Sequence, residues 1–260
     1  MVQEFPVPVE PPIMCERVAH GMAAAPHAAA VLLDLLGAIK TMPVAEALVA
    51  ESLAYGLLQG SAEHARWLES REPVVARAPG RVLLDRDCDR LAITLDRAES
   101  ANAIDVAMRD GLREGFELAA LDPDIARVEL RGLGKAFSVG ADLAEFGTTR
   151  DPATAHAIRM ATLPALAIAR CCKPLAVHVQ GACIGAGLEL AAFASTLTAS
   201  RKAWFQLPEL AMGLIPGAGG CVSVSRRIGR QRTALMVLSG QRIGAEVALR
   251  WGLVDRLVDD

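Results

Sequence analysis

A glycine-rich turn between an apolar run and a helix-like segment constrains this chain more than any other stretch. Residues 173–190 read KPLAVHVQGACIGAGLEL, in which Leu175 to Val179 lead into three glycines and then into a helical pattern. A turn of this kind leaves backbone N–H groups at the start of a helix without intrahelical partners. Those groups form a small site for an anion, or for an oxygen that becomes negative during a reaction.

The residues around the glycines exclude the common nucleotide-binding turns and introduce two carboxylates. GxGxxG is absent, and no GK[ST] follows the glycines. Instead, Glu189 lies just after the turn in an otherwise apolar helix start, and Glu209 follows within FQLPELAMGLIPGAGG at 205–220. Two carboxylates in apolar surroundings beside such a turn indicate acid–base chemistry on a carbonyl compound.

Composition favours an ordinary globular enzyme over a nucleic-acid or membrane protein. A chain of 260 residues with 52% hydrophobic side chains can bury one large core and carry an appendage. A net charge of −3 gives no reason to expect a nucleic acid or a membrane surface as partner. The six cysteines form no CxxC pair and share no ligand spacing with the five histidines. We therefore expect no metal site and a reducing, cytoplasmic compartment.

The chain divides into three segments by pattern. Residues 1–14 carry four prolines and should form an extended arm. Residues 15–72 are helical in pattern throughout, and the stretch 44–58 has two apolar faces, one with Val44, Leu48, Tyr55 and Leu58 and one with Ala45, Val49 and Leu53. From 73 to 260, strand-like and helix-like segments alternate, which predicts the α/β class.

Five ordered motifs resemble the crotonase (enoyl-CoA hydratase/isomerase) superfamily. They read LDRAESANAID (95–105), GKAFSVGADLAEF (134–146), KPLAVHVQGACIGAGLELA (173–191), FQLPELAMGLIPGAGG (205–220) and SGQRIGAEVALRWGLVD (239–255). One glycine turn alone would be weak evidence for a family, whereas five motifs in the same order are specific evidence. The resemblance implies a crotonase-like spiral of ββα units with a helical module packed on the core. It also implies a homotrimer or a hexamer of two trimers.

The helical segment resembles the part of the family that ordinarily comes last. EALVAESLAYGLLQGSAEHARWLESR is similar to the C-terminal trimerisation helices of ordinary members, and this chain stops at GLVDRLVDD, where those helices would begin. We interpret the order as a circular permutation, which folds tolerate because contacts, not chain order, define them. Tyr55, Leu58 and Trp67 should then lie over the pocket or on its rim, and Met14 near Leu257. The alternative is an unrelated helical domain at 15–72.

The resemblance also implies the catalytic groups. The thioester oxygen would be held by the backbone N–H groups of Ala141 and Ala186, and alanine fits the second position only at negative φ. Glu189 and Glu209 correspond to the family's two catalytic glutamates. Glu189 would activate the water, Glu209 would protonate C2, and Gly217 would offer a further backbone N–H. The alternative is that both glutamates are helix-end or salt-bridge residues.

The family further implies a slot for coenzyme A, which is part of the substrate, so that no separate cofactor is expected. Backbone groups around four residues are candidates to line it: Ala101, Ala103, Val139 and Leu143. Arg97 is the candidate cation for the phosphates, and a solvated surface arginine is the alternative.

Two further polar residues each allow two interpretations. His178 could shape the acyl pocket or be a packed core histidine. Asp142 resembles a second catalytic acid, but it is also placed to cap its own short helix.

These features together favour an enoyl-CoA hydratase acting on a CoA thioester. The same site could instead shift a double bond or hydrolyse a C–C bond, or the protein could bind acyl-CoA without catalysis. A binding protein gains nothing from buried carboxylates, which argues against the last alternative. A Clp-type peptidase is excluded, because no Ser/His/Asp set lies near the two glycine turns.

Overall fold

The computed structural model describes residues 8–72, 75 and 77–259. Half of the predicted proline-rich arm, residues 1–7, therefore lies outside the described residues. The remainder of the arm lies on the body of the protein. Glu10 pairs with Arg232 at 3.0 Å, and the Pro12 carbonyl accepts a hydrogen bond from Gln241 Nε2 at 2.7 Å. These contacts join the start of the chain to its last quarter.

The predicted helical segment forms four α-helices and one short 3₁₀ turn. They are α1 (Cys15–Ala24), α2 (Pro26–Ala38), η1 (Ile39–Thr41), α3 (Val44–Gln59) and α4 (Ala62–Ser70). Pro26 occupies the first turn of α2, where its missing N–H costs nothing. Ser61 caps α4, since its hydroxyl accepts from the His64 N–H at 3.2 Å. The helical interpretation of residues 15–72 is thus confirmed.

Two sheets organise the rest of the chain. The larger has the order β1-β2-β3-β4-β6-β9, formed by Arg81–Asp87, Arg90–Asp96, Arg127–Gly132, Leu175–Val179, Thr196–Ser200 and Arg256–Val258. Its first two strands form an antiparallel hairpin, and the other pairs are parallel. The smaller sheet has the order β5-β7-β8, formed by Ala182–Ile184, Trp204–Gln206 and Ile243–Gly244.

Helices follow the strands in repeated units. The α-helices of this part are α5 (Val106–Leu121), α6 (Pro152–Thr162), α7 (Pro164–Cys171), α8 (Ala186–Ala191), α9 (Gly220–Ser239) and α10 (Ala245–Trp251). The 3₁₀ turns are η2 (Ala98–Ser100), η3 (Leu143–Glu145) and η4 (Glu209–Met212). A break at Leu163 separates α6 from α7, because the proline at 164 cannot continue a helix. The order β4-β5-α8 recurs as β6-β7-η4-α9, which confirms the α/β class.

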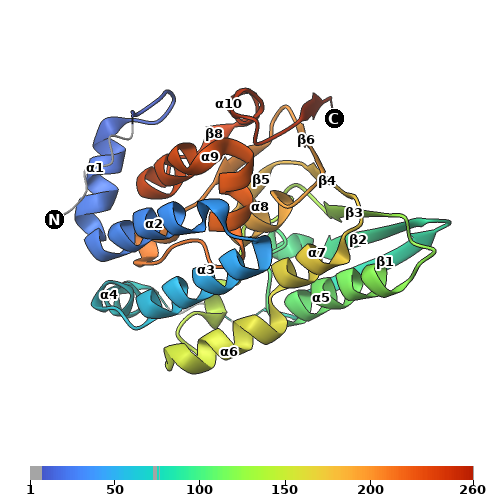
Figure 1. Ribbon diagram of the computed structural model, residues 1–260, viewed down its shortest axis with the longest axis horizontal. Helices are drawn as coiled ribbons and strands as arrows, with labels where there is room; N and C mark the ends of the chain where they lie inside the picture. Colours follow the sequence, from blue (N-terminus) through green and yellow to red (C-terminus); the bar gives the residue numbers. More distant parts are fainter. Residues whose placement is uncertain (1–7, 73–74, 76, 260) are drawn as a thin grey trace.

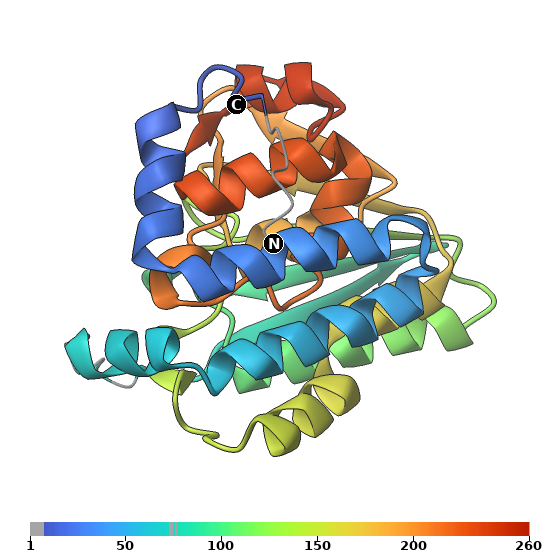
Figure 2. The ribbon, with the colours of Figure 1, turned by 60° about the vertical axis from the view of Figure 1, so that its left-hand side comes forward.

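The helical segment packs directly on this core. Both α1 and α2 contact α9, and α3 contacts α6 and α7 (Figures 1 and 2). One buried apolar cluster includes Leu32 and Leu48 from the helical segment and Leu235 from α9. Within one chain, the N–H of Met14 lies 3.4 Å from Gln241 Oε1, and Figure 1 shows β9 far from α1. The predicted approach of Met14 to Leu257 is therefore not found within one chain. Between neighbouring subunits it stays a prediction.

Among the described residues, no single helix combines the length and apolarity needed to cross a membrane. The pair Cys15–Ala24 and Pro26–Thr41 meets that test only when taken together, and it is bent by 110°.

Candidate active site

The turn before α8 brings its backbone against Glu209. Gly185 ends β5 with φ 48° and ψ −126°, a conformation that strains residues with a side chain. A Cβ at this position would also lie 2.8 Å from Glu209 Oε1. Ala186 follows as the first residue of α8, and it is not among the residues with positive φ. The condition under which alanine can replace glycine there is thus met.

A second glycine turn presents another N–H group beside the first. Ile104 bonds both neighbours of Ala141: its N–H donates to the Gly140 carbonyl at 2.8 Å, and its carbonyl accepts from the Asp142 N–H at 2.9 Å. The N–H of Ala141 therefore faces the opposite side of the strand. A Cβ at Gly140 would lie 3.4 Å from the Ala186 nitrogen, so the two turns are in contact.

A cavity of about 740 Å³ lies in front of these turns, within the size range of small-molecule sites. All five residues predicted to be catalytic line it: Ala141, Ala186, Glu189, Glu209 and Gly217.

Glu189 is buried and held by the start of α9. Its Oε2 accepts hydrogen bonds from the N–H groups of Ala218 at 2.6 Å and Gly220 at 2.8 Å. Burial raises the pKa of Glu189 to about 7, although these two bonds pull it down. A carboxyl group with this pKa can take up or release a proton near neutral pH.

Glu209 is buried in η4 but is held less tightly. Its Oε2 has no hydrogen-bond partner among the residues that the structure describes. Burial raises the pKa of Glu209 well above its usual value, and the neighbouring Glu189 and Glu51 charges raise it further. The result is a carboxyl group that releases its proton less readily than usual and has one oxygen without a hydrogen-bond partner among the described residues.

A third buried carboxyl group, Glu51 of α3, was not foreseen. Its side-chain oxygens accept from the N–H groups of Gly219 at 2.6 Å and Val222 at 3.3 Å. Glu51 and Glu189 thus accept hydrogen bonds from different N–H groups at the start of α9. Burial raises the pKa of Glu51 well above its usual value, and the charge of Glu189 adds to this. A sequence signal existed, because Glu51 follows Leu48 by three positions and so lies on the same buried helix face.

Gly217 lies at the cavity, but it is not one of the N–H groups that hold Glu189. It packs against Tyr55, since a Cβ at Gly217 would lie 2.3 Å from Tyr55 Cδ2. A side chain at 217 would thus displace the Tyr55 ring. Its N–H remains a predicted ligand of the substrate or the water.

The three aromatic and aliphatic residues expected at the pocket have different positions. Tyr55 lines the cavity, as predicted. Trp67 packs edge-on against Phe146, at 5.7 Å between ring centroids, and Phe146 lines the cavity. Leu58 is buried in the apolar core and is not part of the lining, so its predicted position was wrong.

Three of the four residues predicted to line a coenzyme A slot lie at the cavity. Ala103, Val139 and Leu143 line the cavity, whereas Ala101 does not. Ala101 adopts φ 49°, and its carbonyl accepts from the Val139 N–H at 3.1 Å. Through this hydrogen bond, Ala101 holds the backbone of Val139, which forms part of the cavity wall.

Arg97 is a buried structural residue. It is therefore neither a cation for the phosphates nor a solvated surface arginine, and both interpretations were wrong. Its side chain is 2% exposed and donates to the carbonyls of Ala78 and Ala103 and, at 2.6 Å, to Asp142. An arginine so enclosed can neither reach a phosphate nor be solvated. Arg77 is exposed, lines the same end of the cavity and donates to Ser100 Oγ at 3.2 Å, so it replaces Arg97 as the candidate cation.

Asp142 and His178, for which the sequence left two interpretations each, have structural roles. Asp142 caps η3, because its side chain accepts from the Ala144 N–H at 2.9 Å. Burial alone would raise the pKa of Asp142, but this bond and Arg97 hold it below its usual value. His178 lies within hydrogen-bond distance of Thr198, with 3.0 Å between Nδ1 and Oγ1, and is absent from the cavity lining.

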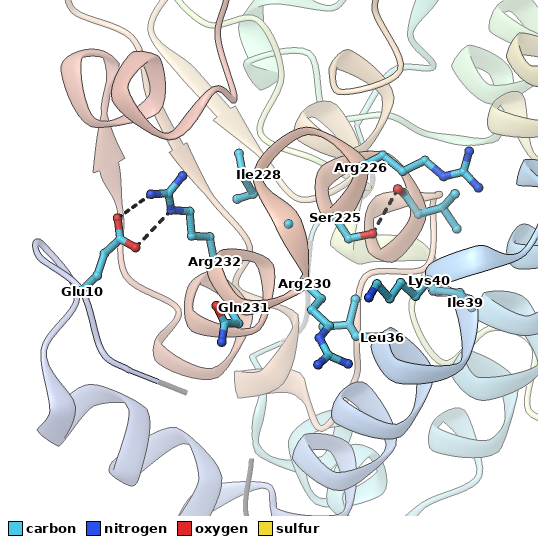
Figure 3. A pocket seen from close by; sticks show the side chains of 12 residues that line it. Glu10, Leu36, Ile39, Lys40, Ser225, Arg226, Ile228, Arg230, Gln231 and Arg232 are labelled. Carbon is cyan, nitrogen blue, oxygen red and sulfur yellow. Dashed lines mark hydrogen bonds and ion pairs between the residues drawn. The ribbon is translucent and has the colours of Figure 1, made fainter. Parts of the chain in front are cut away.

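A second cavity, of about 600 Å³, lies where α9 is broken at Gly229 (Figure 3). It is lined by Lys40, Arg226, Arg230 and Arg232 together with Glu10, which pairs with Arg232. No pair of buried carboxyl groups faces it among the described residues. The acid–base site is therefore the first cavity.

Comparisons with known proteins all identify relatives of one kind. Residues 90–260 match the family model described as enoyl-CoA hydratase/isomerase. The chain is 35% identical over 173 residues to 2,3-dehydroadipyl-CoA hydratase of Escherichia coli K12, a match covering 66% of this chain and 67% of that protein. It is 36% identical over 180 residues to probable enoyl-CoA hydratase EchA14 of Mycobacterium tuberculosis H37Rv, covering 69% and 70%. The solved structure of enoyl-CoA hydratase from Thermoplasma volcanium superposes with a TM-score of 0.63 at 36% identity, covering 69% and 72%.

Proposed function

Because the chain belongs to the enoyl-CoA hydratase/isomerase family and has its crotonase α/β fold, we propose that it adds water across the C2–C3 double bond of a 2-enoyl-CoA thioester. One observation carries this proposal. Two buried carboxyl groups, Glu189 and Glu209, line one cavity together with Ala141 and Ala186 of the two glycine turns. That set contains an acid, a base and a place for an enolate oxygen.

The two N–H groups would bind the thioester oxygen. As water attacks C3, negative charge moves onto that oxygen, and donors already in place stabilise it without reorganisation. One such donor is worth about 2.7–4 kcal/mol to the transition state. Because both donors belong to the backbone, only a substitution by proline, which has no N–H, removes one of them.

The two glutamates would divide the proton transfers. Glu189, whose pKa is about 7 and whose anion is held by two N–H groups, would take a proton from the attacking water. Glu209, whose raised pKa keeps it protonated, would deliver a proton to C2. The hydroxyl group of the water ends on C3, its other proton on Glu189, and the proton of Glu209 on C2. Exchange with solvent then restores both carboxyl groups.

Coenzyme A would enter past the walls formed by Ala103, Val139 and Leu143, with Arg77 near its phosphates. Coenzyme A is part of the substrate in this proposal, and no separate cofactor takes part. A homotrimer or a hexamer in the cytoplasm is the assembly and compartment that we propose.

The test is an activity screen with the full chain against 2-enoyl-CoAs from four carbons upward, following the loss of the conjugated thioester absorbance. We expect hydration of at least one of them. A shift of the double bond without uptake of water would instead make the protein an isomerase. Tight binding without turnover of any substrate would contradict the catalytic proposal.

A further inference from the structure

Arg159 of α6 is a cation at the cavity without a carboxylate partner. Its Nε donates to Ser52 Oγ at 2.9 Å, its Nη2 to the Ser52 carbonyl at 3.0 Å, and its Nη1 to Gln59 Oε1. Within the described part of the chain, none of its contacts is an ion pair. Arg109 also lines the cavity, but its charge is balanced by Glu145. Arg159 thus differs from its neighbour: the buried Glu51 acts on it electrostatically, but no carboxylate among the described residues forms an ion pair with it.

The hydrogen bonds of Arg159 leave capacity for a ligand. A guanidinium group carries five N–H donors, and the protein acceptors engage three of them. An alkyl chain that filled this end of the cavity would strip water from the remaining two and give nothing back, which is costly for a charged group. A carboxylate would accept both N–H groups as a planar pair and neutralise the charge.

The position of Arg159 fits the far end of an acyl chain. Its guanidinium carbon lies 4.7 Å from the centre of the Tyr55 ring. Tyr55 packs in turn against Gly217, next to the Ala218 N–H that holds Glu189. The cation therefore lies about one aromatic ring beyond the acid–base pair. A group a few carbons past C3 would meet it.

We propose that Arg159 determines specificity, and that the acyl chain of the substrate ends in a carboxylate which pairs with this guanidinium group. The inference rests on the proposed function in one respect, that the cavity accepts a CoA thioester. The substrate class is then the mono-CoA thioester of a short unsaturated dicarboxylic acid.

Binding of two saturated thioesters of equal length tests the inference without any reaction. The probes are hexanoyl-CoA and the mono-CoA thioester of the linear six-carbon diacid. We expect the wild-type protein to bind the diacid thioester at least tenfold more tightly, as measured by calorimetry. Arg159→Gln should bring the two affinities to within about threefold, while Arg109→Gln should leave their ratio unchanged. Arg159→Lys, which keeps the charge but not the planar fork, should give an intermediate ratio.

Equal wild-type affinities would overturn the inference and leave Arg159 as a clamp between α3 and α6. This comparison needs no variant, so a folding defect of Arg159→Gln cannot obscure it. A ratio that Arg159→Gln does not change would overturn it as well.

The corresponding 2-enoyl thioesters separate this inference from the proposed function. If neither is hydrated but the diacid still binds more tightly, hydration fails and the specificity stands. If both are hydrated with equal kcat/KM and bound equally, hydration stands and the specificity fails.

Discussion

Glu189 and Glu209 share a cavity but hold their protons differently, and this difference makes their exchange by glutamine informative. Glu189→Gln removes the group that takes a proton from water, and Glu209→Gln removes the one that delivers a proton to C2. Each should lower kcat by about 10²-fold or more, the usual scale for a general acid or base, with little change in CoA binding. The measurement is steady-state hydration together with CoA affinity. Near-wild-type rates in both variants would show that another residue moves the proton.

Glu51 should support the site through the backbone that it holds. The variant Glu51→Gln keeps an oxygen that can accept from the Gly219 N–H and removes a charge that burial disfavours, so it should keep most of the stability and activity. Glu51→Ala leaves the buried Gly219 N–H without an acceptor, while the Val222 N–H keeps the Gly219 carbonyl at 3.1 Å, and this loss should lower the free energy of unfolding by about 1–3 kcal/mol. Urea denaturation of both variants is the measurement. Equal stability of the alanine and glutamine variants would exclude this role.

Single residues show where sequence reasoning reaches its limit. Glu189 could be found because it follows a recognisable glycine turn, and Glu209 because it lies in one of the motifs that resemble the family. Arg97 could not be placed, because its burial depends on Asp142, forty-five positions away in the chain. Glu51 was missed for a similar reason. It lies in a segment read only for its helical pattern, and its partners at 219 and 222 become neighbours only in the folded chain.

The turn between β5 and α8 allows a test of a backbone group by itself. Ala186→Pro removes one N–H donor, while proline at the first position of a helix is well tolerated and leaves both glutamates in place. We expect a folded protein with kcat reduced by about 10²–10³-fold. Ala186→Gly, which keeps the N–H group, is the matched control and should remain active. A fully active proline variant with native circular dichroism would remove Ala186 from the oxyanion hole.

At the scale of elements, the long and strongly patterned segments were predictable and the short ones were not. The strands before and after the first core turn, and the break at Pro164, follow from apolar runs and from proline chemistry. The strands β5, β7 and β8 are two or three residues long and carry no periodicity. They exist because they pair with one another across the molecule. The φ of 80° at Gly229 lies inside α9 and interrupts that helix.

At the scale of the whole molecule, α3 carries an apolar stripe that one chain leaves uncovered. Val49, Leu53 and Leu57 are 40%, 55% and 67% exposed, and they lie at helical spacing on the second face expected from sequence. We expect sedimentation to show a trimer or a hexamer, and Leu53→Asp to shift it toward smaller species. Leu121→Asp, at an exposed leucine of α5, should leave the assembly unchanged. A stable wild-type monomer would contradict the prediction.

The order of the chain can be tested by rewiring it. The helical segment supplies Glu51 and Tyr55 to the site and shares one apolar cluster with the core, so deletion of residues 1–72 should give an insoluble or inactive protein. Deletion alone does not distinguish a permuted module from an added domain that has become essential. We therefore expect a reordered chain, residues 73–260 followed by a flexible linker and residues 15–72, to fold and to hydrate the same substrate. Recovery of activity after reordering would support the permutation, because the contacts and not the connection would then define the module. A soluble and fully active 73–260 fragment would instead show that the helices are a separate domain.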